Sequence, residues 1–405
     1  MLERKNGGTL PALSLLVAGF ALSQAYRTLA AITVPGLTAD FAASARELGL
    51  YAATFHLAFA AIQIPLGVAL DRFGPRRVAS ILGLVSAVGS GLSALAPNMP
   101  VLLVGQALVG IGCAPGLLGT MVYMSRTIEP QRFARVSGVV FAAGGIGMLA
   151  TATPLAWLVD VTNWRAPFVV LGILSLLNAL AVLAVVRDPP PAPGHRHESL
   201  RAAVAGIWEV LRQRQSAGII ALGLVSYGTA MTVRGLWVVP LFTDRWHFSL
   251  LENGNLMLAI SIVMLVMPVP FGRADPGPAR RAAVIVGASV ATCLTLVGLA
   301  LGTGSVAIDV AVALLFAGFS SFQVLQYADV QSSYPAHLTG RAMASFNSSV
   351  FLGVALLQAT SGLVAQEAGL FGWPVLPAVF SWLAVALAIG TLLFAMLPRA
   401  KMNVR

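Results

Sequence analysis

Long apolar stretches dominate the sequence, and they are the feature that most constrains how the chain can fold. Each stretch is about 20 residues or longer, enough for a helix to cross ~30 Å of hydrocarbon. Backbone N–H and C=O groups inside a bilayer must bond within their own segment, so each stretch is predicted to be a helix. We therefore predict an all-α membrane protein with twelve transmembrane helices, at residues 11–35, 47–70, 78–97, 100–124, 134–159, 165–186, 216–241, 252–271, 282–302, 305–328, 341–364 and 373–397.

The amount and distribution of charge agree with this prediction. Of the 405 residues, 58% are hydrophobic and 10% are charged, whereas a soluble domain has roughly 25% charged residues. The net charge of +10 would suit nucleic-acid binding, but most basic residues lie in every second loop, all on the same side of the predicted membrane. Loops rich in lysine and arginine are typical of the cytoplasmic side. We predict a multi-pass protein of a bacterial inner membrane, with both termini cytoplasmic, contacting lipids and no nucleic acid.

A polar interruption divides the predicted spans six and six. It runs from Arg187 to Gln215 and begins with a proline-rich segment, which is typical of a stiff, extended linker. From Glu198 onward, apolar residues recur at helical spacing, which predicts an amphipathic helix on the cytoplasmic membrane surface. The predicted domains are an N-terminal six-helix bundle at 1–187, a cytoplasmic linker at 188–215 and a C-terminal six-helix bundle at 216–405.

The loop between the second and third predicted spans contains the sequence GVALDRFGPRR, Gly67–Arg77. It resembles the loop 2–3 signature of the major facilitator superfamily, and FGRADPGPARR at Phe271–Arg281 is a weaker echo in the second half. The resemblance covers essentially the whole chain. It implies the fold of that superfamily, two pseudo-symmetric six-helix bundles that transport by alternating access. The signature residues are Gly67, Asp71, Arg72, Gly74, Arg76 and Arg77.

The resemblance also implies that this loop acts as a conformational latch. Asp71 would dock at the N-terminus of helix eleven, around Arg341, while the cavity opens outward, since a helix N-terminus favours a carboxylate. The alternative is that Asp71 caps a turn and interacts with adjacent arginines. Gly67 and Gly74 would allow tight packing and a sharp turn. In the second copy, Gly272 falls where Asp71 would be, so a latch there would be weaker.

Two positions depart from the patterns of proton-coupled superfamily members. Gln106 occupies the place of an arginine early in span four, and Pro154 in span five lacks the glycines that follow it in drug antiporters. Both departures count against a proton/drug antiporter. The small residues of span four instead predict close helix packing; they are Gly105, Gly110, Gly112, Gly116 and Gly119.

Two arginines lie deep within predicted spans, at corresponding positions of the two halves. Arg27 is in helix one and Arg234 in helix seven, each roughly 9–12 Å inside the outer helix end at 1.5 Å per residue. A charge inside a span costs at least ~2.5–3.5 kcal/mol on insertion scales. The resemblance implies that helices one and seven line the central cavity. It also places His56, at a similar depth in helix two, around the same cavity.

No acidic residue lies equally deep, so these arginines have no evident buried counter-ion. A buried charge normally has a partner, and the arginine fork can hold two oxygens of a carboxylate or phosphate. We therefore predict that a small organic anion binds between Arg27 and Arg234. Position and helical spacing add the remaining predicted binding residues, which are His56, Gln24, Tyr227, Gln323 and Asn347.

The same residues allow other interpretations. Either arginine could extend toward the membrane surface or bond to backbone carbonyls without touching a ligand. His56 could be a hydrogen-bonded packing residue, or it could carry a coupled proton. Methionines such as Met231 and Met257 could bind copper, although packing explains them better.

The leading functional hypothesis is a secondary active transporter of a small organic anion, with protons as one candidate coupling ion. The alternatives are a proton-driven metabolite or drug exporter and, less favoured, a transition-metal (copper) transporter. No phosphate-binding GxxxxGK(S/T) loop is present, so ATP is not the expected driver. His56 has no acidic partner within the spans, which disfavours an enzyme. We expect a monomer with no cofactor and no metal site.

Overall fold

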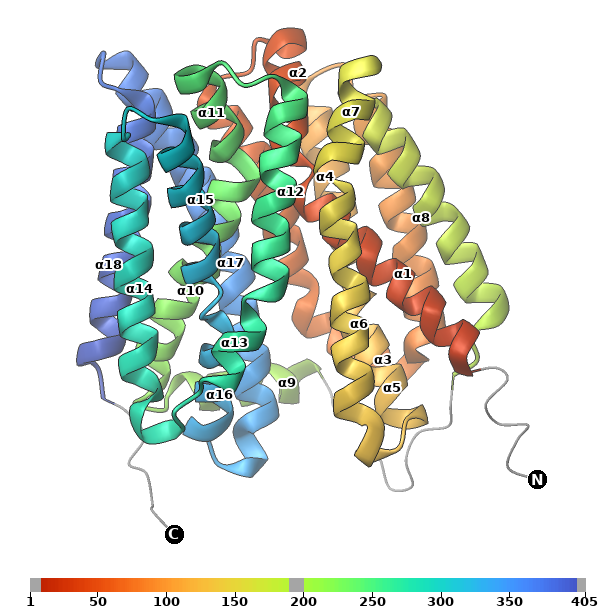
Figure 1. The fold of residues 1–405 in the computed structure, drawn as a ribbon. Coiled ribbons are helices and arrows are strands. Elements are labelled where there is room, and N and C mark those ends of the chain that lie inside the picture. Colours follow the sequence, from red (N-terminus) through yellow and green to blue (C-terminus); the bar gives the residue numbers. More distant parts are fainter. Residues whose placement is uncertain (1–8, 189–199, 399–405) are drawn as a thin grey trace.

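The computed structural model describes residues 9–188 and 200–398, and every regular element in these ranges is a helix (Figure 1). The predicted helix start at Glu198 lies outside the described residues. The first group of helices is α1 Thr9–Thr28, α2 Ala30–Phe41, α3 Ala45–Ala94, α4 Met99–Cys113, α5 Pro115–Thr127, α6 Pro130–Ala150, α7 Thr153–Val161 and α8 Ala166–Val185. After α9 Leu200–Leu211 come α10 Ser216–Thr232, the π-helix η2 Val233–Trp237, α11 Val238–Trp246, α12 Leu250–Val266, α13 Pro268–Arg273, α14 Pro278–Leu301, α15 Val306–Ser320, α16 Gln323–Ser333, α17 Ala336–Leu370 and α18 Val375–Met396.

Among the described residues, eleven helical segments are long and apolar enough to cross a membrane. One of them is α3, whose 50 residues would extend ~75 Å at 1.5 Å per residue, enough for two crossings of a ~30 Å core. This helix turns at Gly74, where φ is +78°, a conformation that glycine adopts at little steric cost. Counting α3 twice gives twelve crossings, so the predicted number is confirmed.

Several crossings consist of two helices joined end to end. The first crossing breaks at Leu29, between α1 and α2. A proline begins the second helix of two others, Pro115 in α5 and Pro268 in α13, because proline lacks an N–H for the preceding helix and suits the first turn of a new one. The seventh crossing is interrupted by η2, whose second residue is Arg234. Single π-turns of this kind frequently occur at functional sites.

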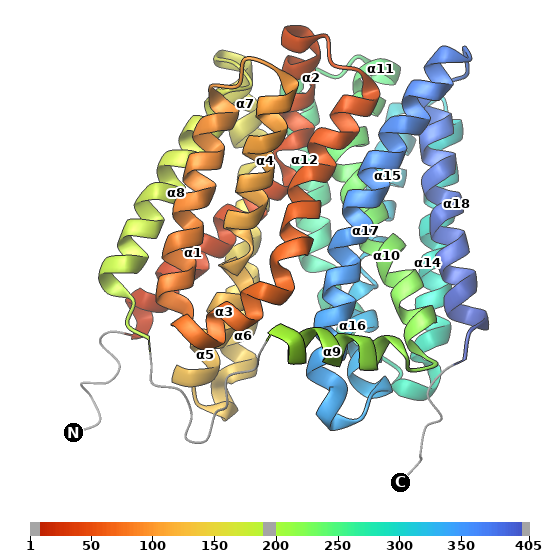
Figure 2. The ribbon, with the colours of Figure 1, turned by 180° about the vertical axis from the view of Figure 1, so that it is seen from behind.

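The helices α1–α8 and α10–α18 form two groups, and α9 lies across their ends on one side of the molecule (Figures 1 and 2). We call this the α9 side and the opposite one the far side. The amphipathic helix predicted within the linker is therefore present, in contact with α3, α10 and α17. The domain boundaries and the cytoplasmic location of the α9 side stay predictions.

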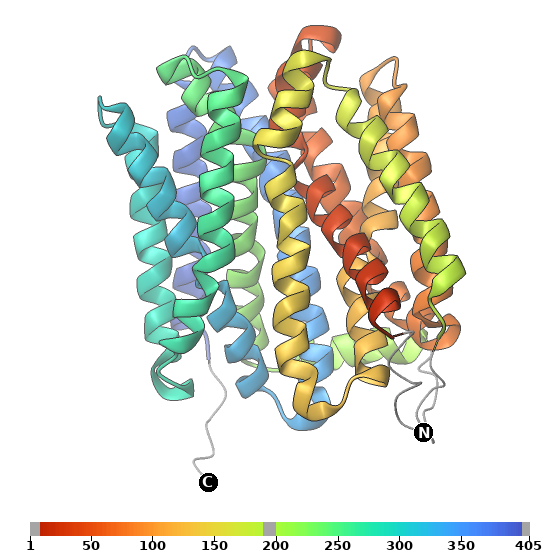
Figure 3. The same cartoon turned by 45° about the vertical axis from the view of Figure 1, so that its right-hand side comes forward.

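The two groups of helices pack closely on the far side. Helix α3 runs against α17 (Figure 2), and α7 runs against α12 (Figure 3). A Cβ on Gly49 would lie 2.7 Å from the backbone oxygen of Gln358 and 2.9 Å from the Cα of Gly362, so the backbones of α3 and α17 touch there. The hydroxyl of Thr153 donates to Asn255 Oδ1 at 2.8 Å between α7 and α12. The far side is therefore closed.

On the α9 side, the predicted latch residues have other partners. Asp71 pairs with Arg126 of α5 at 3.6 Å. Arg341, near the start of α17, pairs with Glu209 of α9 at 3.4 Å. An Asp71–Arg341 pair is not among the ion pairs of the described residues. Since the latch is expected only when the cavity opens outward, the pairing seen here belongs to the far-side-closed conformation, and the latch itself stays a prediction.

The turn predicted at Gly74 is confirmed, and its surroundings explain it. A Cβ on this residue would lie 2.4 Å from Asp188 Oδ2. The next helical turn begins with the Arg76 backbone N–H, which donates to Asp188 Oδ1 at 2.8 Å. The carboxylate thus caps the second part of α3, a favourable position for a negative charge. Arg72 and Arg77 are exposed beside this turn.

The close packing predicted at Gly67 is wrong. No atom lies within 4 Å of the position that its Cβ would occupy, so the missing side chain makes room for no neighbour. Four of the five span-four glycines pack closely as predicted, whereas at Gly119 a Cβ would meet its nearest atom at 3.6 Å, an ordinary contact. A Cβ on Gly110, for example, would lie 2.3 Å from a backbone oxygen of α3.

Candidate substrate-binding site

Arg27 lies in the last turn of α1 and is 9% exposed. Its guanidinium donates from Nη1 to Gln24 Oε1 at 2.8 Å and from Nη2 to Ser23 Oγ at 3.4 Å. Its Cζ lies 4.5 Å from the ring centre of Phe59 and 4.7 Å from that of Phe351. Aromatic rings at this distance favour a cation. The Nε–H group is buried and has no hydrogen-bond partner within residues 9–188 and 200–398.

Arg234 lies in η2 and is 1% exposed. Its Nε and Nη2 donate to Ser261 Oγ of α12 at 3.1 and 2.7 Å. Nη2 also donates to the backbone carbonyl of Met148 in α6 at 3.2 Å, so this arginine joins the two groups of helices. Nη1 is buried and finds no hydrogen-bond partner in the part of the chain that the structure describes.

His56, in α3, is 2% exposed. Its Nδ1 lies 3.0 Å from Gln358 Oε1 of α17 and 3.2 Å from the backbone oxygen of Ala52. Because both neighbours are acceptors, the hydrogen is assigned to Nδ1, and Nε2 is left as a bare acceptor. Nε2 is buried and has no hydrogen-bond partner among the described residues. Like Arg234, His56 connects the two groups of helices.

Tyr227 is an electrostatic neighbour of both arginines. Its partly buried side chain packs edge-on against Phe351, with ring centres 6.0 Å apart. It lies within electrostatic range of both Arg27 and Arg234, and His56 lies within the same range of Arg27. These four predicted residues therefore gather at one place between the two groups of helices.

Of the remaining predicted residues, Asn347 and Gln24 lie close to this group, whereas Gln323 makes no hydrogen bond to it among the described residues. Asn347 Oδ1 accepts a hydrogen bond from the hydroxyl of Tyr327 at 2.9 Å, and Tyr327 lies within electrostatic range of Arg27. Gln24 reaches Arg27 directly. Gln323 is the first residue of α16 and is partly exposed. Within the described part of the chain, it makes no hydrogen bond to the other predicted residues.

Sequence reasoning missed several residues that surround the predicted ones. Phe59 and Phe351 contact Arg27, but aromatic residues within apolar spans look like ordinary core residues. Gln358 carried a usable signal, because an amide within an apolar span is costly unless it is hydrogen-bonded. It follows Asn347 by eleven residues, which is three helical turns on the same face of α17.

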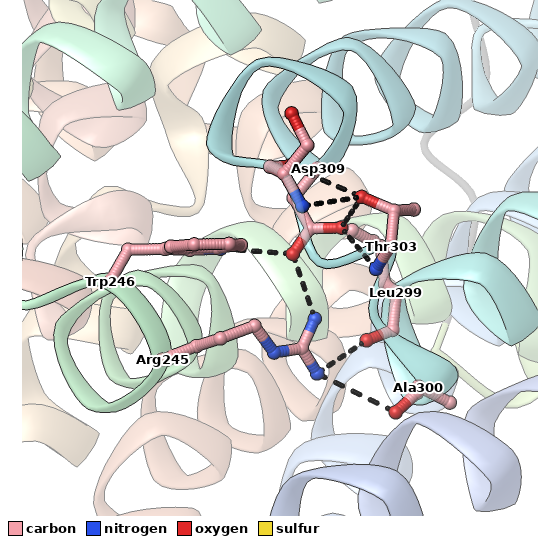
Figure 4. A network of polar contacts seen from close by, with 7 residues as sticks. Arg245, Trp246, Leu299, Ala300, Thr303 and Asp309 are labelled. Carbon is pink, nitrogen blue, oxygen red and sulfur yellow. Dashed lines mark hydrogen bonds and ion pairs between the residues drawn. The ribbon is translucent and has the colours of Figure 1, made fainter.

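The deep arginines differ from two arginines on the far side. Among the described residues, neither Arg27 nor Arg234 forms an ion pair. By contrast, Arg245 donates to Asp309 Oδ2 at 3.0 Å, and Trp246 Nε1 donates to the same oxygen at 2.9 Å (Figure 4). Thr303 donates to Asp309 Oδ1 from its backbone at 3.1 Å and from its hydroxyl at 2.9 Å. We call these four residues the Asp309 clamp.

A second clamp lies on the far side of the first group of helices. Trp164 Nε1 and Arg165 Nη1 both donate to Asp40 Oδ2, at 2.8 and 2.5 Å. These two hydrogen bonds hold the pKa of the Asp40 carboxyl below its usual range. We call the three residues the Asp40 clamp. Both aspartates are thus engaged by arginines of their own group, so neither is a counter-ion for Arg27 or Arg234.

Comparisons with known proteins give the chain its family. Among curated proteins, it is 27% identical over 269 residues to "Efflux pump hmp6" of Hypomyces subiculosus, covering 64% of this chain and 46% of that protein. It is 24% identical over 233 residues to "Probable sulfoacetate transporter SauU" of Cupriavidus necator, covering 54% of each. The matches span about half the length of these relatives.

Among solved structures, the fold matches the nucleoside transporter NupG with a TM-score of 0.75 at 14% identity, covering 96% of this chain and 98% of that chain. An identity this low shows the fold alone. The family model for the Major Facilitator Superfamily matches residues 15–358, which is most of the chain. The protein therefore belongs to the Major Facilitator Superfamily of membrane transporters.

Proposed function

We propose that this superfamily transporter carries a small organic anion, of the carboxylate or phosphate type, bound between Arg27 and Arg234. We further propose a monomer in a bacterial inner membrane, with bundles at 1–187 and 216–405, a cytoplasmic linker at 188–215 and cytoplasmic termini. One observation carries the proposal: two buried guanidinium groups, at corresponding positions of the two halves, form no ion pair within the described chain.

The chemistry of the two guanidinium groups favours an anionic ligand. Nε of Arg27 and Nη1 of Arg234 are buried donors without acceptors in the described part of the chain, and leaving a buried charged donor unsatisfied is costly. An anion supplies acceptors to both, and charge-assisted hydrogen bonds are roughly twice as strong as neutral ones. Tyr227, within range of both arginines, and Gln24 would orient the remaining oxygens.

The placement of the two arginines suits alternating access. Arg27 belongs to the first group of helices and contacts Phe351 of the second. Arg234 belongs to the second group and donates to Met148 of the first. An anion held by both would connect the halves while they rock about a site at mid-depth.

His56 is the candidate for a coupled proton. Its Nε2 is buried and bare, and its Nδ1 is bonded across the halves to Gln358. A proton on Nε2 would place a second positive charge near Arg27, so a bound anion would favour protonation. Exchange of one anion for another without protons is the alternative.

Thermal unfolding of the purified protein tests the anion proposal. A ligand at 100 times its Kd stabilises the folded state by about 2.7 kcal/mol. We expect carboxylates or phosphates to raise the melting temperature, and Arg27→Ala and Arg234→Ala each to abolish the rise. Arg132→Ala is the matched control, because Arg132 is an exposed arginine paired with Glu129, and it should retain the rise. Anion stabilisation that survives in both deep-arginine variants contradicts the proposal.

A second candidate is a proton-driven exporter of metabolites or drugs, which the name of the hmp6 relative favours. In this chain Gln106, where many proton-coupled members have an arginine, donates to Ser93 Oγ at 3.2 Å in helix packing. Melting curves with lipophilic cations and dyes separate the two candidates, because only the exporter hypothesis predicts that these compounds stabilise the folded protein. Copper ions form a third arm of the same screen, and stabilisation by copper alone would favour metal transport.

A further inference from the structure

The linker helix α9 has one face against the protein and an apolar face that is exposed. Gly206 and Val210 are buried. Val204, Trp208 and Leu211 are 52%, 57% and 42% exposed. Spacings of four and three residues place these three side chains on one stripe of the helix, opposite the buried pair. The orientation of α9 against the protein therefore leaves this stripe uncovered.

The position of α9 indicates what covers the stripe. The helix lies crosswise at the ends of the transmembrane helices, beside α3 and α17, where the apolar spans end (Figure 2). Arg212 stacks on Trp208, with its Cζ 5.3 Å from the ring centre, and Arg214 is exposed nearby. Tryptophan and arginine are typical residues at a membrane interface, and basic side chains there attract anionic headgroups.

We propose that α9 binds an anionic lipid surface through Val204, Trp208 and Leu211, with Arg212 and Arg214 at the headgroups, and that this binding favours the conformation open on the α9 side. Since α9 lies beside α3 and α17 at the ends of the transmembrane helices, a bilayer around those helices would reach it without any additional protein.

An ion pair and a close contact connect α9 to Arg341 of α17, in the second group of helices. Glu209 pairs with Arg341 at 3.4 Å, and a Cβ on Gly206 would lie 2.5 Å from Arg341 Cδ. The predicted latch would instead bring Asp71 to Arg341. Lipid that holds α9 in place therefore keeps Arg341 beside Glu209, while Asp71 pairs with Arg126.

Distance measurements by electron spin resonance on the full-length protein in lipid nanodiscs test this proposal. Spin labels at Ser125→Cys of α5 and Gln331→Cys of α16, both exposed on the α9 side, report the separation of the halves in a Cys113→Ser, Cys293→Ser background. Relative to phosphatidylcholine alone, we expect added phosphatidylglycerol to raise the ratio of long-distance to short-distance populations by about fivefold, the factor equivalent to ~1 kcal/mol. An unchanged ratio overturns the proposal.

Replacing the stripe tests whether α9 is the lipid-binding element. Val204→Ala, Trp208→Ala and Leu211→Ala together should remove the effect of phosphatidylglycerol. The matched control replaces three exposed apolar residues of α14 and should keep it; these are Val290→Ala, Leu294→Ala and Val297→Ala. A response retained by the α9 variant contradicts the proposal.

Glu209→Gln separates lipid binding from its conformational effect. Brominated lipids quench tryptophan next to the acyl chains, and the part of the quenching lost in Trp208→Phe reports Trp208. We expect Glu209→Gln to keep this quenching, but its ratio of long-distance to short-distance populations should no longer change when phosphatidylglycerol is added. Absence of Trp208 quenching in the wild type shows that something other than lipid covers the stripe and overturns the proposal. These measurements involve no substrate, so their failure is distinguishable from failure of the anion proposal.

Discussion

Two pairs of arginines in this transporter have opposite surroundings. On the far side, Arg165 and Arg245 each donate to an aspartate whose oxygen also accepts from a neighbouring tryptophan. At mid-depth, Arg27 and Arg234 contact rings, hydroxyls and a carbonyl, and they form no ion pair in the described chain. An arginine of the first kind is satisfied without a ligand. An arginine of the second kind keeps a buried donor without an acceptor among the described residues, and the proposed anion site rests on this difference.

The two far-side clamps add a second contrast, because they share their chemistry but differ in burial. The side chain of Asp309 is 1% exposed, whereas that of Asp40 is 43% exposed. If its partners are removed, an exposed carboxylate turns to water, but a buried one cannot. The Asp309 clamp should therefore contribute much more to stability than the Asp40 clamp.

The largest expected effect comes from breaking the buried clamp. Arg245→Gln leaves the buried Asp309 carboxylate without its cation, and we expect a loss of about 3–5 kcal/mol in the free energy of unfolding. Arg165→Gln removes the cation from the exposed Asp40 carboxylate, which can turn to water, and should lower the melting temperature far less. Thermal unfolding of both variants measures the difference, and equal shifts would refute the role assigned to burial.

The deep arginines should respond in the opposite direction. Arg234→Met replaces an unpaired buried charge with an apolar side chain of similar length, and we expect the ligand-free protein to gain roughly 1–2 kcal/mol. The same variant should lose stabilisation by anions. Arg245→Met is the comparison, because it leaves the buried Asp309 carboxylate without its cationic partner and should lower the stability of the folded protein. A ligand-free Arg234→Met protein that melts well below the wild type would indicate a structural role for this arginine.

A smaller effect should appear at the aromatic pair beside Arg27. Phe351→Leu removes one of two rings close to the guanidinium, and a double-mutant cycle with Arg27→Met should give a coupling energy of about 0.5–2 kcal/mol. Phe346→Leu is the matched control on the same helix, because Phe346 packs against Tyr327 instead. Melting temperatures of the four proteins in each cycle supply the measurement. A coupling as large for Phe346 would show that the effect is not specific to the ring contact.

The smallest expected effect concerns pH and the exposed clamp. Trp164 and Arg165 hold the pKa of Asp40 below its usual value. A lowered folded-state pKa means that the stabilisation is fully present above the unfolded-state pKa, near 4, and is lost as the pH falls through the folded-state pKa. The difference in melting temperature between the wild type and Asp40→Asn should stay constant from about pH 7 to pH 5 and shrink below about pH 4. A difference that grows on acidification would reverse the assigned sign.

The sequence alone predicted the crossings well, because a bilayer imposes length and hydropathy on each span. It did not predict how short the connection between the second and third crossings is, since their two helices meet at one non-helical residue, Gly74, through a backbone angle that composition does not reveal. It found Arg27 and Arg234 because charge is rare in such spans. It missed Phe59 and Phe351 because the spacing of aromatic residues in a span carries no sign of a cation nearby.

The contact between Gly49 and Gly362 has a consequence for how easily the far side can part. Where two helices meet through bare backbone, separating them uncovers hardly any apolar side-chain area, and each Å² exposed to water costs only about 25 cal/mol. A seal made in this way excludes water through closeness of fit, with little hydrophobic burial of side chains at the contact itself. One added methyl group at either glycine would act as a wedge, propping open the entrance from the far side.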